Sequence, residues 1–151
     1  MVRIELADIT DAKAILDLQQ VCYQSEAAIY EDYSIAPLLE TLDQIKAEFD
    51  RQVFLKATEN ERIVGSVRAY TENETCYVGR LIVHPHSQNQ GIGTKLLLSV
   101  EATFMSIRRF ELFTGDRSQK NLALYRKLDY SEFKREKVND KLTLVYLEKQ
   151  V

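Results

Sequence analysis

Apolar and polar residues alternate in the first segment of the chain and then recur with helical spacing. The segment VRIEL, residues 2–6, has the alternation of a half-buried strand, and ADITDA then offers capping residues for a helix. The apolar residues that follow lie three and four positions apart, which predicts a helix that ends near Ala28. This apolar stripe consists of Ile15, Leu18, Val21 and Cys22.

A loop, a second helix and three strands are predicted next. The segment IYEDYSIAP, residues 29–37, mixes aromatic and acidic residues and breaks the helical pattern. Helical spacing then returns at Leu38, Leu42, Ile45 and Phe49. The segments VFLKATE, RIVGSVRAY and TCYVGRLIV follow, separated by the short polar stretches NE and TENE. These three segments predict an antiparallel meander with two tight turns.

The second half of the chain continues with alternating elements. Leu96, Leu97, Val100 and Phe104 form the apolar stripe of a helix, FELFT is a strand, and Leu122, Leu124, Tyr125 and Leu128 mark another helix. The segments FKREKV and KLTLVYLEK flank the turn residues Asn139 and Asp140 and predict a final hairpin.

The predicted order is therefore β-α-α-β-β-β-α-β-α-β-β. This order indicates an α/β fold of the α+β type, in which a mixed, mostly antiparallel sheet of about seven strands carries about four helices on its faces. The middle β-α-β unit is the parallel exception.

Composition narrows the class of protein. The 151 residues, 45% hydrophobic and 28% charged, predict a single globular domain over residues 1–151. Cys22 and Cys76 are far apart, with no CxxC spacing and no histidine cluster, so we expect two reduced, buried thiols and no bound metal.

Charge and hydropathy limit the kinds of partner and the cellular location that we expect. A net charge of −3 argues against a nucleic-acid partner. The first ten residues lack the apolar core of a signal peptide, and no run of eighteen apolar residues occurs. We therefore expect a cytoplasmic protein with no membrane partner.

The segment HPHSQNQGIGTKLL, residues 84–97, places Gly91 and Gly93 at the start of a helix, although glycine is a poor helix former. Without a Cβ at these positions, backbone N–H groups can converge on an anion at the positive end of the helix dipole. The segment contains no GxxxxGK[ST] motif, and Leu96 stands where GxGxxG has its third glycine. The pair alone could equally belong to an ordinary turn.

The segment QNQGIG, residues 88–93, follows a strand and resembles the Q/R-x-x-G-x-G/A motif of the GNAT family of N-acetyltransferases. A second segment, NLALYRKLDY, residues 121–130, is similar to a later helix of that family, and the order of elements agrees over most of the chain. The resemblance implies an enzyme that moves the acetyl group of acetyl-CoA, its co-substrate, to a primary amine by direct transfer in a ternary complex.

The resemblance also implies which residues bind acetyl-CoA. The pyrophosphate would lie on the amides of residues 88–94, and the pantetheine would lie along the end of the preceding strand. A backbone N–H near Val83 would bind the carbonyl oxygen where two parallel strands part. The implied residues are Leu81, Ile82, Val83, Gln88, Asn89, Gln90, Gly91, Ile92, Gly93, Thr94, Asn121 and Tyr125.

Tyr125 is the implied catalytic residue, since its hydroxyl can supply a proton to the departing thiolate. Asn121 lies four positions earlier and therefore shares its helical face. Judged from spacing alone, Tyr125 could be a core aromatic and Asn121 a helix cap. Asp129 stands where the family has glycine, and because aspartate tolerates left-handed geometry we expect no loss of function.

The general base is left open by the sequence. Arg80 stands in the strand where some family members carry a glutamate. Solvent, a base acting through water, or an acid could serve, and each acid could equally be a solvated surface residue. The acids considered are Glu31, Asp32, Glu74 and Glu111, and His84 is expected to be a turn residue.

The acceptor is predicted to be a small-molecule or peptide amine. Tyr30, Glu31, Asp32 and Tyr33 place two carboxylates between two aromatic rings, which suits a cationic amine, although an ordinary loop with buried tyrosines would look the same. The alternative functions are a noncatalytic acyl-CoA-binding or regulatory module and a nucleotide-binding regulator. The final strands could also pair across a homodimer.

Overall fold

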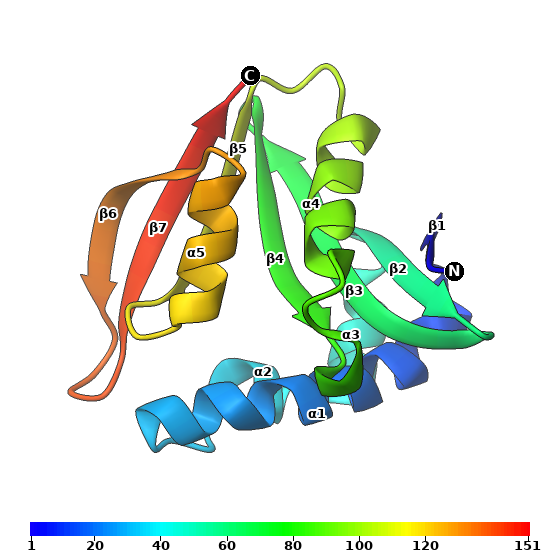
Figure 1. Ribbon diagram of the computed structural model, residues 1–151, viewed down its shortest axis with the longest axis horizontal. Coiled ribbons are helices and arrows are strands. Elements are labelled where there is room, and N and C mark those ends of the chain that lie inside the picture. The colour runs from blue at the N-terminus through cyan, green and yellow to red at the C-terminus, as the bar shows by residue number, and fades with distance from the viewer.

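The computed structural model describes residues 1–151 and contains a seven-stranded sheet with helices on both of its faces (Figure 1). The strands lie in the order β1-β2-β3-β4-β5-β7-β6, and only β4 and β5 are parallel neighbours. The strands are β1 (Arg3–Leu6), β2 (Val53–Glu59), β3 (Arg62–Glu72), β4 (Thr75–Val83), β5 (Arg109–Gly115), β6 (Ser131–Lys137) and β7 (Thr143–Gln150). The helices are α1 (Ala12–Tyr30), α2 (Ala36–Leu39), α3 (Leu42–Glu48), α4 (Ile92–Thr103) and α5 (Gln119–Lys127), with 3₁₀ turns η1 (Ile9–Asp11) and η2 (Pro85–Ser87).

The predicted fold class and element order are confirmed, with one helix more than expected. The single helix predicted from Leu38 to Phe49 is divided into α2 and α3. The division occurs because Glu40 is extended and Thr41 then starts α3 as an N-cap, sharing a capping box with Gln44. The polar residue Thr41 therefore marks the break between the two helices.

The position of α1 also departs from the prediction in detail. The helix continues to Tyr30 rather than ending near Ala28, and Glu31 closes it in the left-handed region with φ 51°. Val21 is 45% exposed, so the predicted stripe was wrong at this position, whereas Cys22 is partly buried and contacts Val83 of β4. The buried face of α1 is Ala12, Ile15, Leu18, Gln19, Ala27 and Tyr30.

The two faces of the sheet are covered differently. On one face, α4 and α5 pack on apolar strand residues, which include Val67, Val78, Leu112 and Val145. A smaller cluster with Ile15, Ile45 and Phe54 joins α1 and α3 to β2. Successive strand residues point to opposite faces of the sheet, so the sequence neighbours of these core residues in β3, β4, β5 and β7 lie on the opposite face. The residues on that face include Arg68, Tyr70, Tyr77, Phe113 and Tyr146.

The two parallel strands separate soon after they begin. β4 and β5 pair only at Thr75 with Arg109, Cys76 with Phe110 and Tyr77 with Glu111. Beyond this point β4 pairs only with β3, and β5 pairs only with β7. In Figure 1 the two strands meet near the C-terminus and diverge toward α1. None of the helices is both long and apolar enough to cross a bilayer.

Asp129 ends α5 in the left-handed region with φ 74°. The N–H of Tyr130 donates to the carbonyl of Tyr125 and the N–H of Asp129 to that of Arg126, which is a Schellman motif. Because only glycine adopts this conformation without strain, we expect Asp129→Gly to raise the free energy of unfolding by about 0.5–1 kcal/mol. Asp129→Ala should lower it by a similar amount, and denaturant melts would measure both. An alanine variant as stable as the glycine variant would contradict this account.

Candidate active site

A cavity of about 780 Å³ lies where β4 and β5 part. Residues of β3, β4, β5 and β7 form its floor, and α1, the loop into α2, one side of α5 and the β6–β7 connection form its walls. Because the strands cannot pair across this gap, their backbone and the neighbouring side chains are available to a ligand. The divergence of two parallel strands thus creates a large cavity within a continuous sheet.

Tyr125 and Asn121 both border this cavity from α5. Tyr125 is only 5% exposed, and no protein group forms a hydrogen bond with its hydroxyl. Burial raises the pKa of Tyr125, and the neighbouring Tyr23 and Glu26 raise it further, so the phenol stays protonated. Asn121 donates through Nδ2 to Glu26 Oε1 and Thr114 Oγ1, each at 3.1 Å. Asn121 lies inside α5, whose N-cap position is held by Ser118, so it is not the cap of this helix.

Glu26 and Tyr23 border the same cavity from α1 and were missed in the sequence. Burial raises the pKa of Glu26, and a hydrogen bond from Ser118 offsets part of that rise. Burial also raises the pKa of Tyr23 to about 12. Tyr23, Glu26 and Tyr30 recur at helical spacing, so a polar and aromatic stripe beside the apolar one was the available signal.

The glycine segment lies outside the cavity, at the start of α4. Gly91 holds the N-cap position with φ 78°, which explains why glycine stands there. Gly93 packs closely, because a Cβ on it would lie 3.3 Å from Leu124 Cδ2. No hydrogen bond outside the helices and strands uses a backbone N–H between residues 88 and 94, and the first N–H groups of a helix have no intrahelical acceptor. The segment therefore presents free donors at a helix N-terminus.

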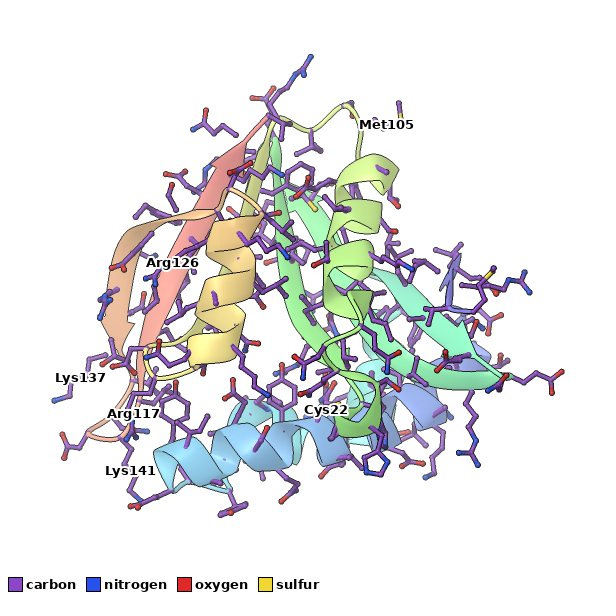
Figure 2. All side chains as sticks on the ribbon, in the orientation of Figure 1. Cys22, Met105, Arg117, Arg126, Lys137 and Lys141 are labelled. Atoms are coloured by element: carbon purple, nitrogen blue, oxygen red, sulfur yellow. The ribbon has the colours of Figure 1, made fainter.

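The remaining implied cofactor residues connect this segment to β4. Leu81 borders the cavity and Ile82 is buried. The carbonyl of Val83 accepts from Gln88 Nε2 at 3.2 Å and from Cys22 Sγ at 3.3 Å. Burial raises the pKa of the Cys22 thiol to about 12, so it stays protonated, and Figure 2 shows this residue on α1 beside the segment that precedes α4.

A β-bulge in β4 lies at the point where the cavity begins. Arg68 pairs with Gly79 and Ser66 with Ile82, so Arg80 and Leu81 together lie opposite Val67. Arg80 has φ 48°, a left-handed conformation inside a strand. Bulges of this kind turn a side chain away from the regular alternation, and here both bulged residues border the cavity.

Of the four residues predicted to bind the acceptor, Tyr30 and Asp32 border the cavity, and Glu31 and Tyr33 do not. Tyr30 is buried against Gly115, where a Cβ would collide with its ring. Its hydroxyl accepts from the N–H of Arg117 at 2.9 Å and shares a 2.8 Å hydrogen bond with Ser118 Oγ. Tyr30 therefore also anchors the end of α1 to the start of α5.

Two more contacts complete a group that we call the α1 clasp, formed by Tyr30, Glu31, Arg117 and Lys141. Lys141 Nζ donates to the carbonyl of Glu31 at 3.0 Å, and an Arg117 Nη donates to the carbonyl of Lys141 at 3.3 Å. Figure 2 shows Arg117 and Lys141 near the free end of α1. The clasp ties α1 to the β6–β7 connection.

The acids considered as a general base fall into two groups. Asp32 and Glu111 border the cavity, whereas Glu31 and Glu74 do not. Glu111 accepts a 2.8 Å hydrogen bond from Arg109, and hydrogen bonds from Ser34 lower the pKa of Asp32. The lowered pKa makes Asp32 a weaker base, and the Glu111 carboxylate is already occupied by Arg109. Glu26, with its raised pKa, is better suited to accept a proton.

The raised pKa of Glu26 predicts a pH-dependent effect on stability. A carboxyl whose pKa is higher in the folded state destabilises the fold once it ionises, so stability falls as pH rises above its ordinary value of 4.5. We expect Glu26→Gln to raise the free energy of unfolding at pH 7, because the neutral amide avoids the cost of a partly buried charge. The gain should vanish near pH 4. Thermal melts at both pH values would measure it, with Glu74→Gln on the exposed β3–β4 turn as the control.

Comparison with known proteins establishes the class of this protein. Residues 12–130 match the model of the Acetyltransferase (GNAT) family, so the chain belongs to that family. A search of curated proteins found no match. No group of three His, Cys, Asp or Glu side chains is placed to hold a metal ion.

Solved structures share the fold at low sequence identity. The ribosomal-protein-S18-alanine N-acetyltransferase from Escherichia coli aligns with a TM-score of 0.82 and 15% identity, covering 100% of this chain and 94% of that one. The PaiA N-acetyltransferase from Thermoplasma acidophilum in complex with coenzyme A has a TM-score of 0.74 and 19% identity, with coverage of 100% and 99%. YncA from Salmonella typhimurium, with its cofactor acetyl-CoA, has a TM-score of 0.76 and 19% identity, with coverage of 99% and 94%.

Proposed function

We propose that this protein transfers the acetyl group of acetyl-CoA to a primary amine, by direct attack in a ternary complex. The observation that carries the proposal is the gap between β4 and β5, which opens into a cavity bordered by the unpaired hydroxyl of Tyr125. Membership of the GNAT family and the fold shared with CoA-bound and acetyl-CoA-bound structures support it.

The free N–H groups of residues 88–94 would bind the pyrophosphate of acetyl-CoA, because several donors and the positive end of α4 meet there. Gly91 keeps side-chain atoms away from the phosphates. The pantetheine would follow the part of β4 that β5 leaves unpaired, from Leu81 to Val83. The thioester then lies beside Tyr125 at the edge of the cavity.

In the reaction, the nitrogen of a neutral amine attacks the thioester carbonyl carbon and forms a C–N bond. A backbone N–H near Val83 would stabilise the negative oxygen that develops. The C–S bond then breaks, and the Tyr125 hydroxyl, held protonated by burial, would transfer its proton to the departing sulfur. The amine proton passes to Glu26 or to water, and Tyr125 regains a proton from solvent.

Calorimetry with acetyl-CoA and, separately, ATP would test the proposal, followed by release of free thiol in the presence of an amine panel. Binding of acetyl-CoA with thiol release supports it. ATP binding without acetyl-CoA binding would overturn it in favour of a nucleotide-binding regulator. Acetyl-CoA binding with no thiol release by any amine, in wild type and in Tyr125→Phe alike, would indicate a noncatalytic acyl-CoA-binding module.

A further inference from the structure

The charged residues that border the cavity differ in how many of their hydrogen bonds other protein groups already make. They are Glu26, Asp32, Arg68, Arg80 and Glu111. Glu111 accepts from Arg109 at 2.8 Å, and Asp32 accepts from the backbone and hydroxyl of Ser34. Asp32 and Glu111 are therefore engaged in protein interactions.

Arg68 is also fully engaged, in a buried cluster with Glu40 and Gln19. Its two terminal nitrogens donate to both oxygens of Glu40 at 3.0 Å, and one of them also donates to Gln19 Oε1 at 3.1 Å. Gln19 Nε2 returns a 2.9 Å hydrogen bond to Glu40 Oε1. Burial alone would raise the pKa of Glu40, but these hydrogen bonds hold it below its ordinary value. Glu40 therefore remains an anion whose acceptors are already in use.

Glu26 accepts a hydrogen bond from Asn121 Nδ2 at 3.1 Å, so Arg80 is the exception among the five. Its Nε lies 3.7 Å from Glu40 Oε1, too far for a hydrogen bond, and no other protein group accepts from its guanidinium. The side chain is only 26% exposed, and with Arg68 it leaves one uncompensated positive charge beside Glu40. Arg80 has the strained φ of 48° and, like its bulge neighbour Leu81, borders the cavity; the thioester would lie beside Leu81.

Two aromatic pairs flank this charge on the open face of the sheet. Tyr70 and Tyr77 stack with centroids 5.2 Å apart, and Phe113 and Tyr146 lie 5.3 Å apart across the gap, on β5 and β7. Phe113 is 51% exposed even though its ring pairs with Tyr146, so part of its apolar surface is open to a ligand. An apolar or aromatic group of a ligand would be buried between these pairs.

We propose that the acceptor is an amine that also carries a carboxylate, an α-amino acid with an apolar or aromatic side chain, and that Arg80 binds the carboxylate. The guanidinium offers a planar pair of donors that matches a carboxylate. The amino group then points toward Leu81 and Tyr125, and the side chain lies between the aromatic pairs. This assignment of the acceptor rests on the proposed function.

Catalytic turnover tests the proposal with matched acceptors: L-phenylalanine, L-phenylalaninamide, phenethylamine and the dipeptide Phe-Glu. We expect kcat/KM for L-phenylalanine to exceed that for phenethylamine and for the amide by at least about tenfold. Arg80→Gln should reduce this ratio to about one, and Arg80→Lys should keep part of it. Arg62→Gln, a substitution of an exposed arginine on β3 outside the cavity, is the control. Preference for Phe-Glu over L-phenylalanine would show that a peptide supplies the carboxylate.

Binding of the acetylated products separates this proposal from the proposed function. N-acetyl-L-phenylalanine should bind at least about tenfold more tightly than N-acetylphenethylamine in calorimetry, with or without CoA, and Arg80→Gln should abolish the difference. Equal binding of the two products, or a preference that survives Arg80→Gln, would overturn the proposal even if acetyl-CoA binds. Failure of acetyl-CoA to bind would instead overturn the proposed function. The comparison of N-acetyl-L-phenylalanine with N-acetylphenethylamine would still test the carboxylate site at Arg80.

Discussion

Replacing Tyr125 with phenylalanine is expected to lower kcat by about 100-fold while changing the Kd of acetyl-CoA by less than about threefold. The expected size reflects the usual contribution of a positioned proton donor. The hydroxyl has no protein partner, so its removal leaves no unpaired group and should leave the melting temperature unchanged or slightly raised. Steady-state kinetics, calorimetry and a thermal melt together measure the three quantities.

Tyr130 provides a matched control for this substitution. Its ring centroid lies 6.3 Å from that of Tyr125, but its hydroxyl donates to Glu101 at 2.9 Å, away from the cavity. Tyr130→Phe should therefore lower the free energy of unfolding by about 1–2 kcal/mol and leave kcat within about twofold. A Tyr125→Phe variant with normal kcat would remove Tyr125 from the reaction, and a less stable one would show that its hydroxyl is structural.

Gly91→Asp is expected to raise the Kd of acetyl-CoA by about 100-fold, which corresponds to about 2.7 kcal/mol. The substitution places a carboxylate where the proposed pyrophosphate would meet the free N–H groups at the start of α4, so like charges repel and a donor can be captured by the new side chain. A Cβ at Gly91 meets no atom within 4 Å, but aspartate is strained at φ 78°, so we expect a folded variant that is less stable by about 1 kcal/mol. Calorimetry measures the affinity, and circular dichroism checks the fold.

Gly91→Asn separates charge from shape at the same position. Asparagine has nearly the size of aspartate and tolerates the φ of 78° found there, but it carries no charge. We expect its Kd for acetyl-CoA to stay within about tenfold of wild type. If both variants bind as wild type does, the pyrophosphate does not lie on this segment. If both lose binding equally, side-chain volume rather than charge is responsible.

The sequence predicted the order of the elements well because hydrophobic periodicity follows directly from the side of each element that faces the core. It also located the free N–H groups at Gly91, since two glycines at a helix start have a physical reason that can be stated before a structure is known. Asp129 in the left-handed region was anticipated in the same way. The division between α2 and α3 was missed because the apolar spacing from Leu38 to Phe49 continues across it, whereas the N-cap at Thr41 interrupts the helix.

The cavity itself could not be predicted from the residues. It depends on where β4 and β5 stop pairing and on the bulge at Arg80, and neither feature leaves a pattern along a single strand. Glu26 was missed for a related reason. Its position beside Asn121 depends on the docking of α1 beneath α5, which joins residues that are 95 positions apart.

The parting of β4 and β5 also has a mechanical consequence. Sheet hydrogen bonds join the segment up to β4 with the segment from β5 onward at only three residue pairs, all at one end. At the other end, the two segments are joined by the hydrogen bond from Asn121 to Glu26 and by the α1 clasp, whose contacts are single hydrogen bonds and a cation over the Tyr30 ring. The two segments are therefore held more firmly at the β4–β5 pairing than at the α1 clasp. We expect local unfolding to begin at the clasp, beside Tyr30, and to expose the cavity at that end while the β4–β5 pairing stays intact.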